Sequence, residues 1–384
     1  MSTELATVTK TGTLADQLAA LGFQLAPNQL DAVQSNPDLV RSILAVGQIA
    51  NAEFLTKIME DFRSRKSTAT LKAHDCDLGL FAQFWNEFAA QVTPDQRVER
   101  DPATLATVPG AWFGITSGLV SLFVIWLHDH GYAVKSINRA VSTVRTYAKM
   151  AISTGQVSDP AEYMRIDLVK GYSEGEGVKV DEKRDRTRRG TKKETPTTIP
   201  ADKIDSLKLD HPRTSQGRRD RLMICLLADH GLRCSDVARL RVGDLDRSSG
   251  RLTVKIKKTG TTIRHKLTKD TAAALGAWID KGDCYTDPGA PLLRPTSKSG
   301  SLAETGDAKG LTTRAIMDRV RKIGEDRGVY RLSPHDFRHN LATRLAESGY
   351  TEEQLRAVFG WANGSATPST YVHLTDYLTV DVDA

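Results

Sequence analysis

Residues 332–339 read LSPHDFRH, and the order of these residues predicts the first turn of a helix. Ser333 suits the capping position, Pro334 the first helical position and Asp336 the third. His335 and Arg338 are then three residues apart and share one face of the helix. An imidazole beside a guanidinium suits a phosphate oxygen, because one group hydrogen-bonds while the other neutralises charge. The stretch therefore indicates part of an active site that handles a phosphate.

Two cationic side chains earlier in the chain are candidates for the same site. Arg233 follows an expected helix stop in the segment GLRCSD at 231–236, where Asp236 is placed to orient it. Lys258 lies at the turn of an expected hairpin, with Lys255 or Lys257 as alternatives. Taken alone, such an arginine is more often a surface or ion-pair residue, and such a lysine is usually solvated. Their weight comes from their combination with the residues above.

Two aromatic side chains follow the quoted stretch. Trp361, directly after Gly360, offers an indole N–H that can only donate, and Tyr371 offers a phenol. A phenol with a pKa of about 10 is a poor nucleophile at neutral pH, so it needs nearby cations to stabilise the phenolate and a five-coordinate phosphorus. A tryptophan in this setting more often packs in the core than donates to a ligand, and Tyr371 taken alone is equally consistent with a functional and a structural role. Neither residue decides the chemistry by itself.

Composition agrees with a polyanionic partner without requiring one. The 384 residues include 53 Lys and Arg against 47 Asp and Glu, a formal net charge of +6. The most apolar stretch, 119–127, is too short to span a bilayer, and the N-terminus lacks a signal-peptide pattern. The cysteines are widely separated, which favours reduced thiols in a cytoplasmic protein with no membrane partner. They are Cys76, Cys225, Cys234 and Cys284.

Changes of pattern divide the chain into four parts. Residues 1–45 form weak amphipathic patches that are poor in cations and are interpreted as a docking or oligomerisation segment. Residues 46–172 have helical periodicity and form an expected core DNA-binding domain. Residues 173–197 carry many Lys, Arg and Gly without apolar periodicity, as in a basic linker. Residues 198–384 form the expected catalytic domain with a C-terminal tail.

Within 46–172, apolar residues recur at spacings of three, four and seven, as on the buried faces of helices. Phe81, Phe84, Phe88 and Ile125 belong to this pattern, and its aromatic residues are expected in the core rather than stacked on nucleotides. The polar faces carry two groups of lysines and arginines. Such faces are usually only solvated, but two of them on one small domain favour a groove for DNA.

The last domain combines helices with one strand pair. Residues 218–230 predict a buried helix that ends at Gly231. Residues 252–256 and 263–267 alternate around a Gly-containing turn, which predicts an antiparallel hairpin. Three further helices are expected at 311–324, 334–347 and 351–359.

Together these segments resemble the tyrosine recombinase (phage integrase) family. The matching segments, in the family's order, are GLRCSDVARLRVGDLD at 231–246, KTG at 258–260, HDFRHNLATRLAESG at 335–349, and FGW at 359–361 through YVH at 371–373. A weaker similarity to the family's helical core-binding domain covers 46–165. The resemblance implies a multidomain α plus mixed α/β protein. A helical SAM-like core-binding domain would precede a mostly helical catalytic domain with a small antiparallel sheet, the DNA breaking-rejoining fold.

The resemblance implies a role for each candidate. Tyr371 would attack a scissile phosphate, leaving a 3′-phosphotyrosyl ester and a free 5′-hydroxyl. Arg233 and Arg338 would hold the non-bridging oxygens. His335 would assist proton transfer, and Lys258 would protonate the leaving 5′-oxygen.

The resemblance also implies partners and requirements. Because the covalent ester conserves the energy of the broken bond, no metal, ATP or other cofactor is expected. The implied partners are double-stranded DNA recombination sites, bound by a homo-tetramer on two paired sites, with accessory DNA-bending or directionality proteins as further candidates. The protein would be cytoplasmic and associated with the nucleoid when bound to DNA.

Two departures from the family pattern stand out. Trp361 occupies a position where many members have histidine, so it can donate and pack but cannot titrate. The spacing from Trp361 to Tyr371 is one residue longer than usual, and the segment Asn363-Gly364 with Pro368 can absorb the insertion as a loop. The longer spacing leaves Tyr377 as a second candidate nucleophile.

Three rival functions remain open. HDFRH at 335–339 mimics a zinc-peptidase helix, but Arg338 would repel the metal and Asp336 is shorter than the required glutamate. A type IB topoisomerase would use similar residues to relax one duplex without exchanging strands. A regulator that binds DNA without cutting it has little support, because the reactive side chains are all present.

Overall fold

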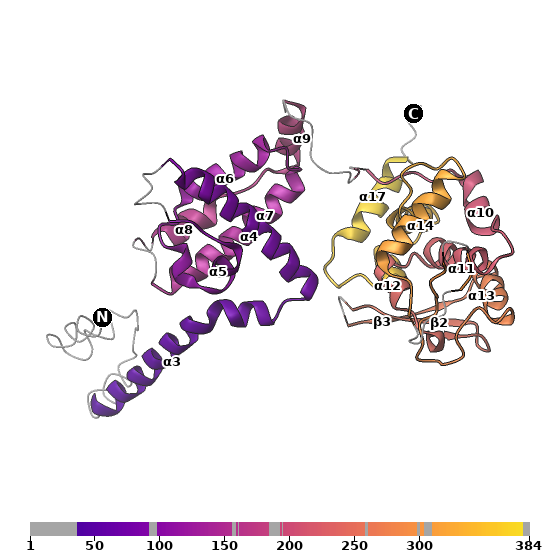
Figure 1. Ribbon diagram of the computed structural model, residues 1–384, viewed down its shortest axis with the longest axis horizontal. Helices are drawn as coiled ribbons and strands as arrows, with labels where there is room; N and C mark the ends of the chain where they lie inside the picture. The colour runs from indigo at the N-terminus through magenta and orange to yellow at the C-terminus, as the bar shows by residue number, and fades with distance from the viewer. Residues whose placement is uncertain are drawn as a thin grey trace. The chain divides into compact units, whose positions relative to one another are not determined.

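The computed structural model describes residues 37–91, 98–155, 159, 161–183, 193, 195–257, 260–297, 300–302 and 309–378. The chain divides into two compact units, an N-terminal unit of residues 1–191 and a C-terminal unit of residues 192–384 (Figure 1). In the described part of the chain, no helix is both long and apolar enough to cross a membrane.

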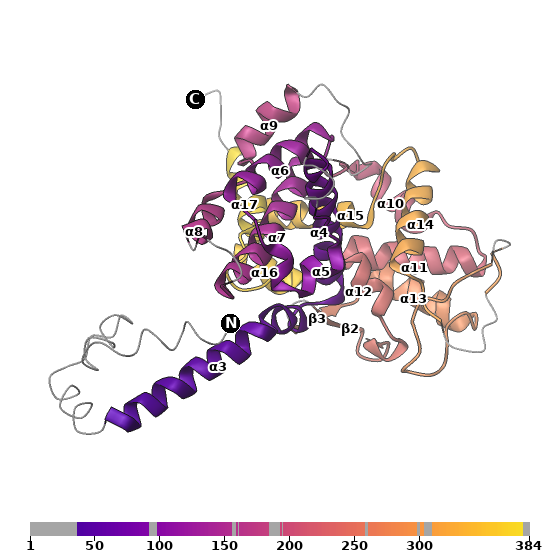
Figure 2. The same cartoon turned by 60° about the vertical axis from the view of Figure 1, so that its left-hand side comes forward.

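The described part of the N-terminal unit is helical. Its first element, α3 (Pro37–Ser64), runs across the predicted boundary at residue 45, and its first half extends away from the other helices of the unit (Figure 1, Figure 2). The remaining helices are α4 (Thr68–Ala89), α5 (Pro102–Thr107), η2 (Pro109–Trp112), α6 (Ser117–Asp129), α7 (Val134–Ser153), α8 (Ala161–Leu168) and α9 (Glu174–Glu182).

An aromatic cluster fills the core of the N-terminal unit. Phe81 stacks on Trp112, with ring centroids 5.5 Å apart, and both side chains are buried. Phe84 is buried as predicted, but Phe88 is 41% exposed, so the prediction that it lies in the core was wrong. Apolar periodicity shows that a helix has an apolar face, but it does not show how much of that face a neighbouring helix covers.

Several cations of the predicted basic faces are already paired within the N-terminal unit. Asp77 on α4 is fully buried and accepts from Arg139 on α7 at 2.8 Å. Arg145 and Lys149 on α7 both pair with Asp167 of α8 at 2.8 Å. These residues join helices to one another, so the formal charge of the two faces overstates the free charge available to a phosphate backbone.

Helix α9 occupies the start of the segment predicted as an unstructured linker. Ser173 and Glu176 form a capping box at its first turn, with the Ser173 amide donating to the Glu176 carboxylate at 2.8 Å. Gly177 lies against Val134 so closely that a Cβ at this glycine would be 3.0 Å from the valine side chain. The contact explains a helix that has little apolar periodicity of its own.

The C-terminal unit surrounds a buried central helix, α11 (Ser215–His230), which packs against α10 (Ala201–Leu209), α13 (Lys269–Asp280) and α15 (Pro334–Glu347). Its other elements are α12 (Cys234–Arg239), η3 (Val242–Asp244), α14 (Thr313–Glu325), α16 (Glu352–Phe359) and α17 (Thr367–Leu378). The helices expected near residues 218, 311, 334 and 351 are therefore confirmed, and their starts shift by at most a few residues.

A three-stranded antiparallel sheet with order β1-β2-β3 flanks these helices. The strands are β1 (Leu245–Asp246), β2 (Arg251–Lys255) and β3 (Thr262–Lys266). Leu252 pairs with His265 and Val254 with Ile263, which confirms the predicted hairpin. The buried positions alternate along β2, as expected for a sheet with one face on the core.

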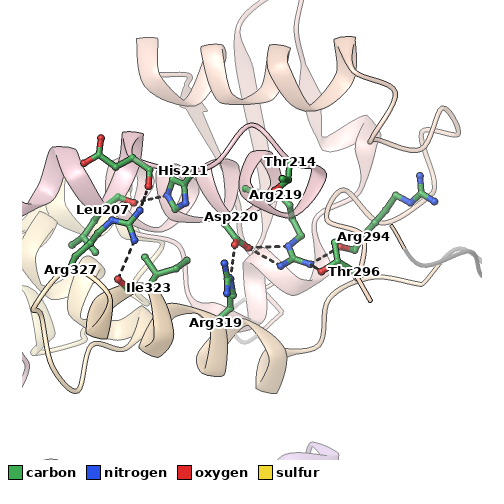
Figure 3. A network of polar contacts seen from close by, with 12 residues as sticks. Leu207, His211, Thr214, Arg219, Asp220, Arg294, Thr296, Arg319, Ile323 and Arg327 are labelled. Atoms are coloured by element: carbon green, nitrogen blue, oxygen red, sulfur yellow. Dashed lines mark hydrogen bonds and ion pairs between the residues drawn. The ribbon is translucent and has the colours of Figure 1, made fainter. Parts of the chain in front are cut away.

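A buried polar network ties α11 to α14 and to the chain near residue 296 (Figure 3). Asp220 is fully buried and accepts from Arg219 at 2.8 Å and from Arg319 of α14 at 2.5 Å. Arg219 also donates to Thr296 at 2.8 Å. Two guanidinium groups thus share one carboxylate. Their charge and hydrogen bonds compensate for the loss of water around the buried carboxylate.

Candidate active site

Arg338 occupies the centre of the site. It is 3% exposed and donates to the carbonyl of Gly231 at 2.7 Å and to that of Phe359 at 2.9 Å. These carbonyls lie at the C-terminal ends of α11 and α16, where the helix dipole is negative and a cation is favoured. Burial, with the charge of Arg233 second, lowers the pKa of Arg338 to about 9. The cation is held in place by carbonyl groups, and among the described residues no carboxylate forms an ion pair with it, although the charge of Asp236 partly offsets the shift.

Gly231 makes this arrangement possible. Its φ of 58° is in the left-handed region, and a Cβ would come within 2.4 Å of the Phe359 ring. Only glycine therefore allows the end of α11 to approach the end of α16 closely enough for one guanidinium to reach both carbonyls. The helix stop predicted from the sequence is also a close-packing position.

Arg233 precedes α12 and has a donor without an acceptor. Its Nη1 is buried and makes no hydrogen bond to any described residue, and it lies 3.8 Å from the Oδ2 atom of Asp236. The other carboxylate oxygen of Asp236 accepts from Arg239 at 2.6 Å. An oriented guanidinium with a free donor beside a second guanidinium suits an anionic oxygen atom.

His335 is exposed on α15, and the charges of Arg338 and Arg233 both act on its ring. The protein around its ring and then the charge of Arg338 lower its pKa below the ordinary value, with Arg233 adding to the effect. The imidazole is therefore neutral at pH 7 and can donate from one nitrogen while accepting at the other.

Asp336 anchors the turn that leads into α15. Its buried carboxylate accepts from the backbone amide and hydroxyl of Ser333 at 2.7 and 2.8 Å and from the Thr197 amide at 3.0 Å. Lys193 donates to the same carboxylate and, at 2.9 Å, to the carbonyl of Arg331. Arg331 has a φ of 59°, which is uncommon for a residue other than glycine. Lys193 and Thr197, predicted to lie in the linker, thus hold the turn before His335.

Trp361 and Tyr371 complete the cluster. Their rings stack with centroids 5.8 Å apart and planes 11° apart, and the guanidinium of Arg338 lies 5.2 Å from the Trp361 ring. Tyr371 is 6% exposed. The connecting chain turns at Asn363-Gly364, where Gly364 has a φ of 81°, before α17 begins at Thr367. Asn363-Gly364 therefore form a turn as predicted, whereas Pro368, predicted to belong to the same loop, lies in the first turn of α17.

His339 is a site residue that the sequence analysis did not select. Its Nδ1 atom lies 3.0 Å from the Tyr371 hydroxyl, and the two ring centroids are 5.1 Å apart. His339 is four residues after His335 on α15, which places both on neighbouring positions of one helix face. The spacing of four residues from His335 could have predicted that His339 lies near the site. It could not predict that His339 contacts Tyr371, which is 32 residues further along the chain.

Comparison with known proteins identifies the family. A family model described as "Phage integrase family" matches residues 198–377. Curated relatives include the tyrosine recombinase XerC of Azotobacter vinelandii, 27% identical over 267 residues that cover 69% of this chain and 78% of that protein. A second is the tyrosine recombinase Synpcc7942_B2651 of Synechococcus elongatus, 24% identical over 79% of this chain and 83% of that one.

Residues 198–377, the predicted catalytic domain, belong to the phage integrase family. Solved structures agree on the fold. A lambda integrase dimer bound to a core site has a TM-score of 0.50 at 16% identity and covers 83% of this chain and 94% of its own. The XerH recombinase on palindromic difH has a TM-score of 0.51 at 16% identity and covers 86% and 84%. The expected fold class is confirmed, and so is site-specific DNA recombination as the function; neither topoisomerase nor regulator is favoured.

The recombinase hairpin that carries Lys258 is fixed close to Trp361. Lys258 itself lies outside the described residues. The hairpin base packs on Gly360, where a Cβ would lie 3.1 Å from Ile256 and 3.3 Å from Ile263. The start and end of the hairpin loop are joined by a hydrogen bond of 2.8 Å from the Ile256 amide to the Thr261 carbonyl.

The zinc-peptidase alternative fails on the position of one carboxylate in this recombinase. Asp336, which would have to act as general base, is buried and already accepts from Ser333, Thr197 and Lys193. His339, which would be a ligand, faces Tyr371 instead. The described residues contain no group of three or more His, Cys, Asp or Glu that could hold a metal ion.

Proposed function

We propose that Tyr371 is the nucleophile with which this recombinase cuts DNA. Its hydroxyl oxygen attacks the scissile phosphorus, a 3′-phosphotyrosyl ester forms, and the bond to the 5′-oxygen breaks to leave a free 5′-hydroxyl. The observation that carries this proposal is the stack of Tyr371 on Trp361, the ring over which Arg338 also lies. The phenol is thereby held beside a preorganised buried cation, which stabilises the charge that develops in the transition state.

Arg233 and Arg338 are proposed to hold the two non-bridging oxygens. Arg338 is buried, and the positive charge of Arg233 disfavours its charged form. A phosphodiester brings the missing negative charge and supplies an acceptor for the unpaired Nη1 of Arg233. Substrate binding therefore removes an electrostatic penalty that the free protein carries.

The remaining roles complete the reaction. His335, neutral and adjacent to the arginines, assists proton transfer at the phosphate. Lys258, on the hairpin fixed at Gly360, protonates the leaving 5′-oxygen. Trp361 packs under the nucleophile and offers its indole N–H as a donor. Because the ester conserves the energy of the broken bond, religation to a second 5′-hydroxyl needs neither ATP nor a metal.

The reaction assembly is proposed to be a homo-tetramer on two paired recombination sites, serving a mobile element in the cytoplasm. Exchange requires two duplexes and two cuts in each, so four protomers supply one nucleophile per cut. The relatives named above, a lambda integrase dimer on a core site and XerH on difH, are DNA complexes and support duplex DNA as the substrate. Accessory bending or directionality proteins remain candidates for setting the direction of exchange.

The test of the nucleophile uses labelled duplexes from the ends of the encoding element, nicked next to the cleavage position so that the released fragment diffuses away. Wild type should give a covalent protein–DNA band on a denaturing gel. Tyr371→Phe should give none, while the matched control Tyr377→Phe should behave as wild type. A band that survives in Tyr371→Phe and disappears in Tyr377→Phe would transfer the role to Tyr377.

The test of strand exchange adds a second, unlabelled duplex of different length. Transfer of the label to a product of the new length is expected for recombination. Relaxation of a supercoiled plasmid without such a product would indicate a topoisomerase. Native mass measurement of the paired complex should give four protomers for two duplexes; a complex of two would contradict the tetramer.

A further inference from the structure

The nucleophile proposed above must lose a proton, and the roles assigned so far provide no acceptor in contact with it. Tyr371 is 6% exposed, so bulk water has little access to its hydroxyl. Burial raises the pKa of Tyr371, and the charge of Arg338 only partly opposes this effect. The phenol is therefore protonated before reaction, and a nearby acceptor has to take the proton as the oxygen attacks.

The side chain in contact with the hydroxyl is His339. Its Nδ1 atom lies 3.0 Å from the Tyr371 oxygen, a normal length for a hydrogen bond. Burial lowers the pKa of His339, against the opposing charge of Asp336, so the ring is neutral at pH 7. A neutral imidazole with its proton on Nε2 presents a lone pair at Nδ1, and the phenol donates to it.

The two histidines of α15 face different reaction partners. His335 is exposed and lies near Arg338 and Arg233, the side chains proposed to bind the phosphate. His339, one helical turn later, is half-buried and points to the phenol. No hydrogen bond joins His335 to Tyr371 among the residues that the structure describes. His339 is thus placed to act on the proton of Tyr371, whereas His335 is placed to act at the phosphate.

We propose that His339 is a catalytic residue of this recombinase, the general base that accepts the proton of Tyr371. As the hydroxyl O–H bond breaks, the proton moves to Nδ1 and the oxygen forms its bond to phosphorus. The bond from phosphorus to the 5′-oxygen breaks, and Lys258 protonates that oxygen. In religation a 5′-hydroxyl gives its proton back to Lys258 and forms a bond to phosphorus, the 3′-phosphotyrosyl bond breaks, and His339 returns the proton to the phenolate. The inference rests on Tyr371 being the nucleophile.

The first measurement compares single-turnover cleavage of the nicked duplex by wild type and by His339→Asn. The asparagine can keep a hydrogen bond to the phenol but cannot accept its proton, so cleavage should slow by about 10²–10⁴-fold, the usual contribution of a general base. DNA binding and thermal unfolding, measured on the same preparations, should stay close to wild type. If this variant unfolds, His339→Gln serves in its place.

The second measurement separates proton transfer from packing. A fluorinated tyrosine, whose phenol is more acidic, is introduced at position 371 by suppression of a stop codon. A more acidic phenol needs a base less, so this residue should restore most of the lost rate in His339→Asn and change wild type little. Arg338→Lys is the matched control, because its defect lies in charge stabilisation and should not be rescued.

The outcomes are distinct. A slow His339→Asn that the fluorinated tyrosine does not rescue would show that His339 only packs, and the inference would fall. An unchanged or faster His339→Asn would equally overturn it, the faster case identifying the hydrogen bond as a brake on the nucleophile. Loss of the covalent band in Tyr371→Phe is measured in parallel; if the band persists there, the proposed function fails, whatever His339 does.

Discussion

Arg338 donates to the backbone carbonyl of Gly231 at 2.7 Å, so the buried guanidinium is tied to the chain only two residues before Arg233. The bond fixes the spacing between the two cations proposed to bind one phosphate. It also gives the two arginines different surroundings. Arg338 is satisfied by carbonyl groups of the protein, whereas Arg233 keeps a donor free.

This difference predicts different effects of two alanine substitutions. Arg233→Ala should reduce cleavage by 10²–10³-fold, the scale of one lost electrostatic donor of about 3–4 kcal/mol, and leave thermal stability unchanged. Arg338→Ala should reduce cleavage at least as much and also lower the free energy of unfolding by about 2 kcal/mol, because two buried carbonyls lose their partner. Single-turnover cleavage and denaturant unfolding measure the two quantities. Equal stability losses in both variants would contradict the assignment.

Trp361 offers a test of donor against stacking. Trp361→His keeps a ring donor and should therefore retain cleavage. Trp361→Phe keeps the stack on Tyr371 but loses the N–H, and should lose about tenfold if the indole donates to the phosphate, in line with a net hydrogen bond of about 1.4 kcal/mol. Cleavage rates of both variants on the nicked duplex decide. Full activity of Trp361→Phe with an inactive Trp361→His would assign the residue to packing alone.

The ion pair between Lys193 and Asp336 should contribute to the stability of the fold and to the positioning of His335. Asp336→Asn leaves Lys193 beside a neutral group in a buried setting, and should lower the free energy of unfolding by about 3 kcal/mol. Lys193→Met should cost less, since Lys193 is 21% exposed, yet slow cleavage by freeing the turn before His335. The double variant shows whether the two effects couple. Strict additivity would mean that the residues act separately.

His230 predicts how stability depends on pH. It is 2% exposed, its Nε2 lies 3.2 Å from the Thr271 hydroxyl, and burial lowers its pKa to about 4. The unfolded chain binds a proton near pH 6.5 while the folded chain does not, so stability is complete above that pH and is lost as pH falls from 6.5 towards 4. The full effect is about 3 kcal/mol. Unfolding of His230→Asn at several pH values should show a shallower decline; an identical pH dependence would contradict this origin.

Removal of residues 1–36 should spare binding to the core site. The segment carries one basic residue, Lys10, against the acidic residues Glu4, Asp16 and Asp31, so it offers phosphates little attraction. Cutting before Pro37 keeps α3 whole, which a cut at residue 45 would not. Binding of the truncated chain to a single labelled site is the measurement. A large loss of affinity would show that the segment contributes to DNA contact.

Features with a local chemical cause were predictable from the sequence. Ser333 with Asp336 marked the start of α15, and Gly231 marked the end of α11. The predicted members of the site that the structure describes also fall in one cluster. Arg233 and Trp361 follow helix ends, His335 and Arg338 lie on α15, and Tyr371 lies on α17, which packs against α15. The proposed catalytic roles remain to be tested by the variants above.

Features with a distant cause were missed. The ion pair of Lys193 is made with Asp336, which is 143 residues further along the chain, and no local sequence pattern predicts it. Helix α9 depends on Val134 of another helix, so its own sequence resembled a linker. His339 became visible only when folding placed Tyr371 opposite it. Contacts of this kind are set by tertiary packing, which periodicity and capping chemistry do not encode.

Gly360 has a wider consequence for how the reaction could be tuned. Its φ of 59° is in the left-handed region, and a Cβ here would lie only 3.1 Å from Ile256 and 3.3 Å from Ile263 of the hairpin, so any side chain would crowd the contact between the hairpin and the end of α16. The hairpin that carries the proposed acid is therefore in direct contact with Gly360, the residue before Trp361. A single methyl group at this position would act as a spacer, moving the proton donor away from the leaving oxygen while the nucleophile stayed in place. Such a protein would still cut, slowly, and would be expected to accumulate the uncut complex rather than the covalent one.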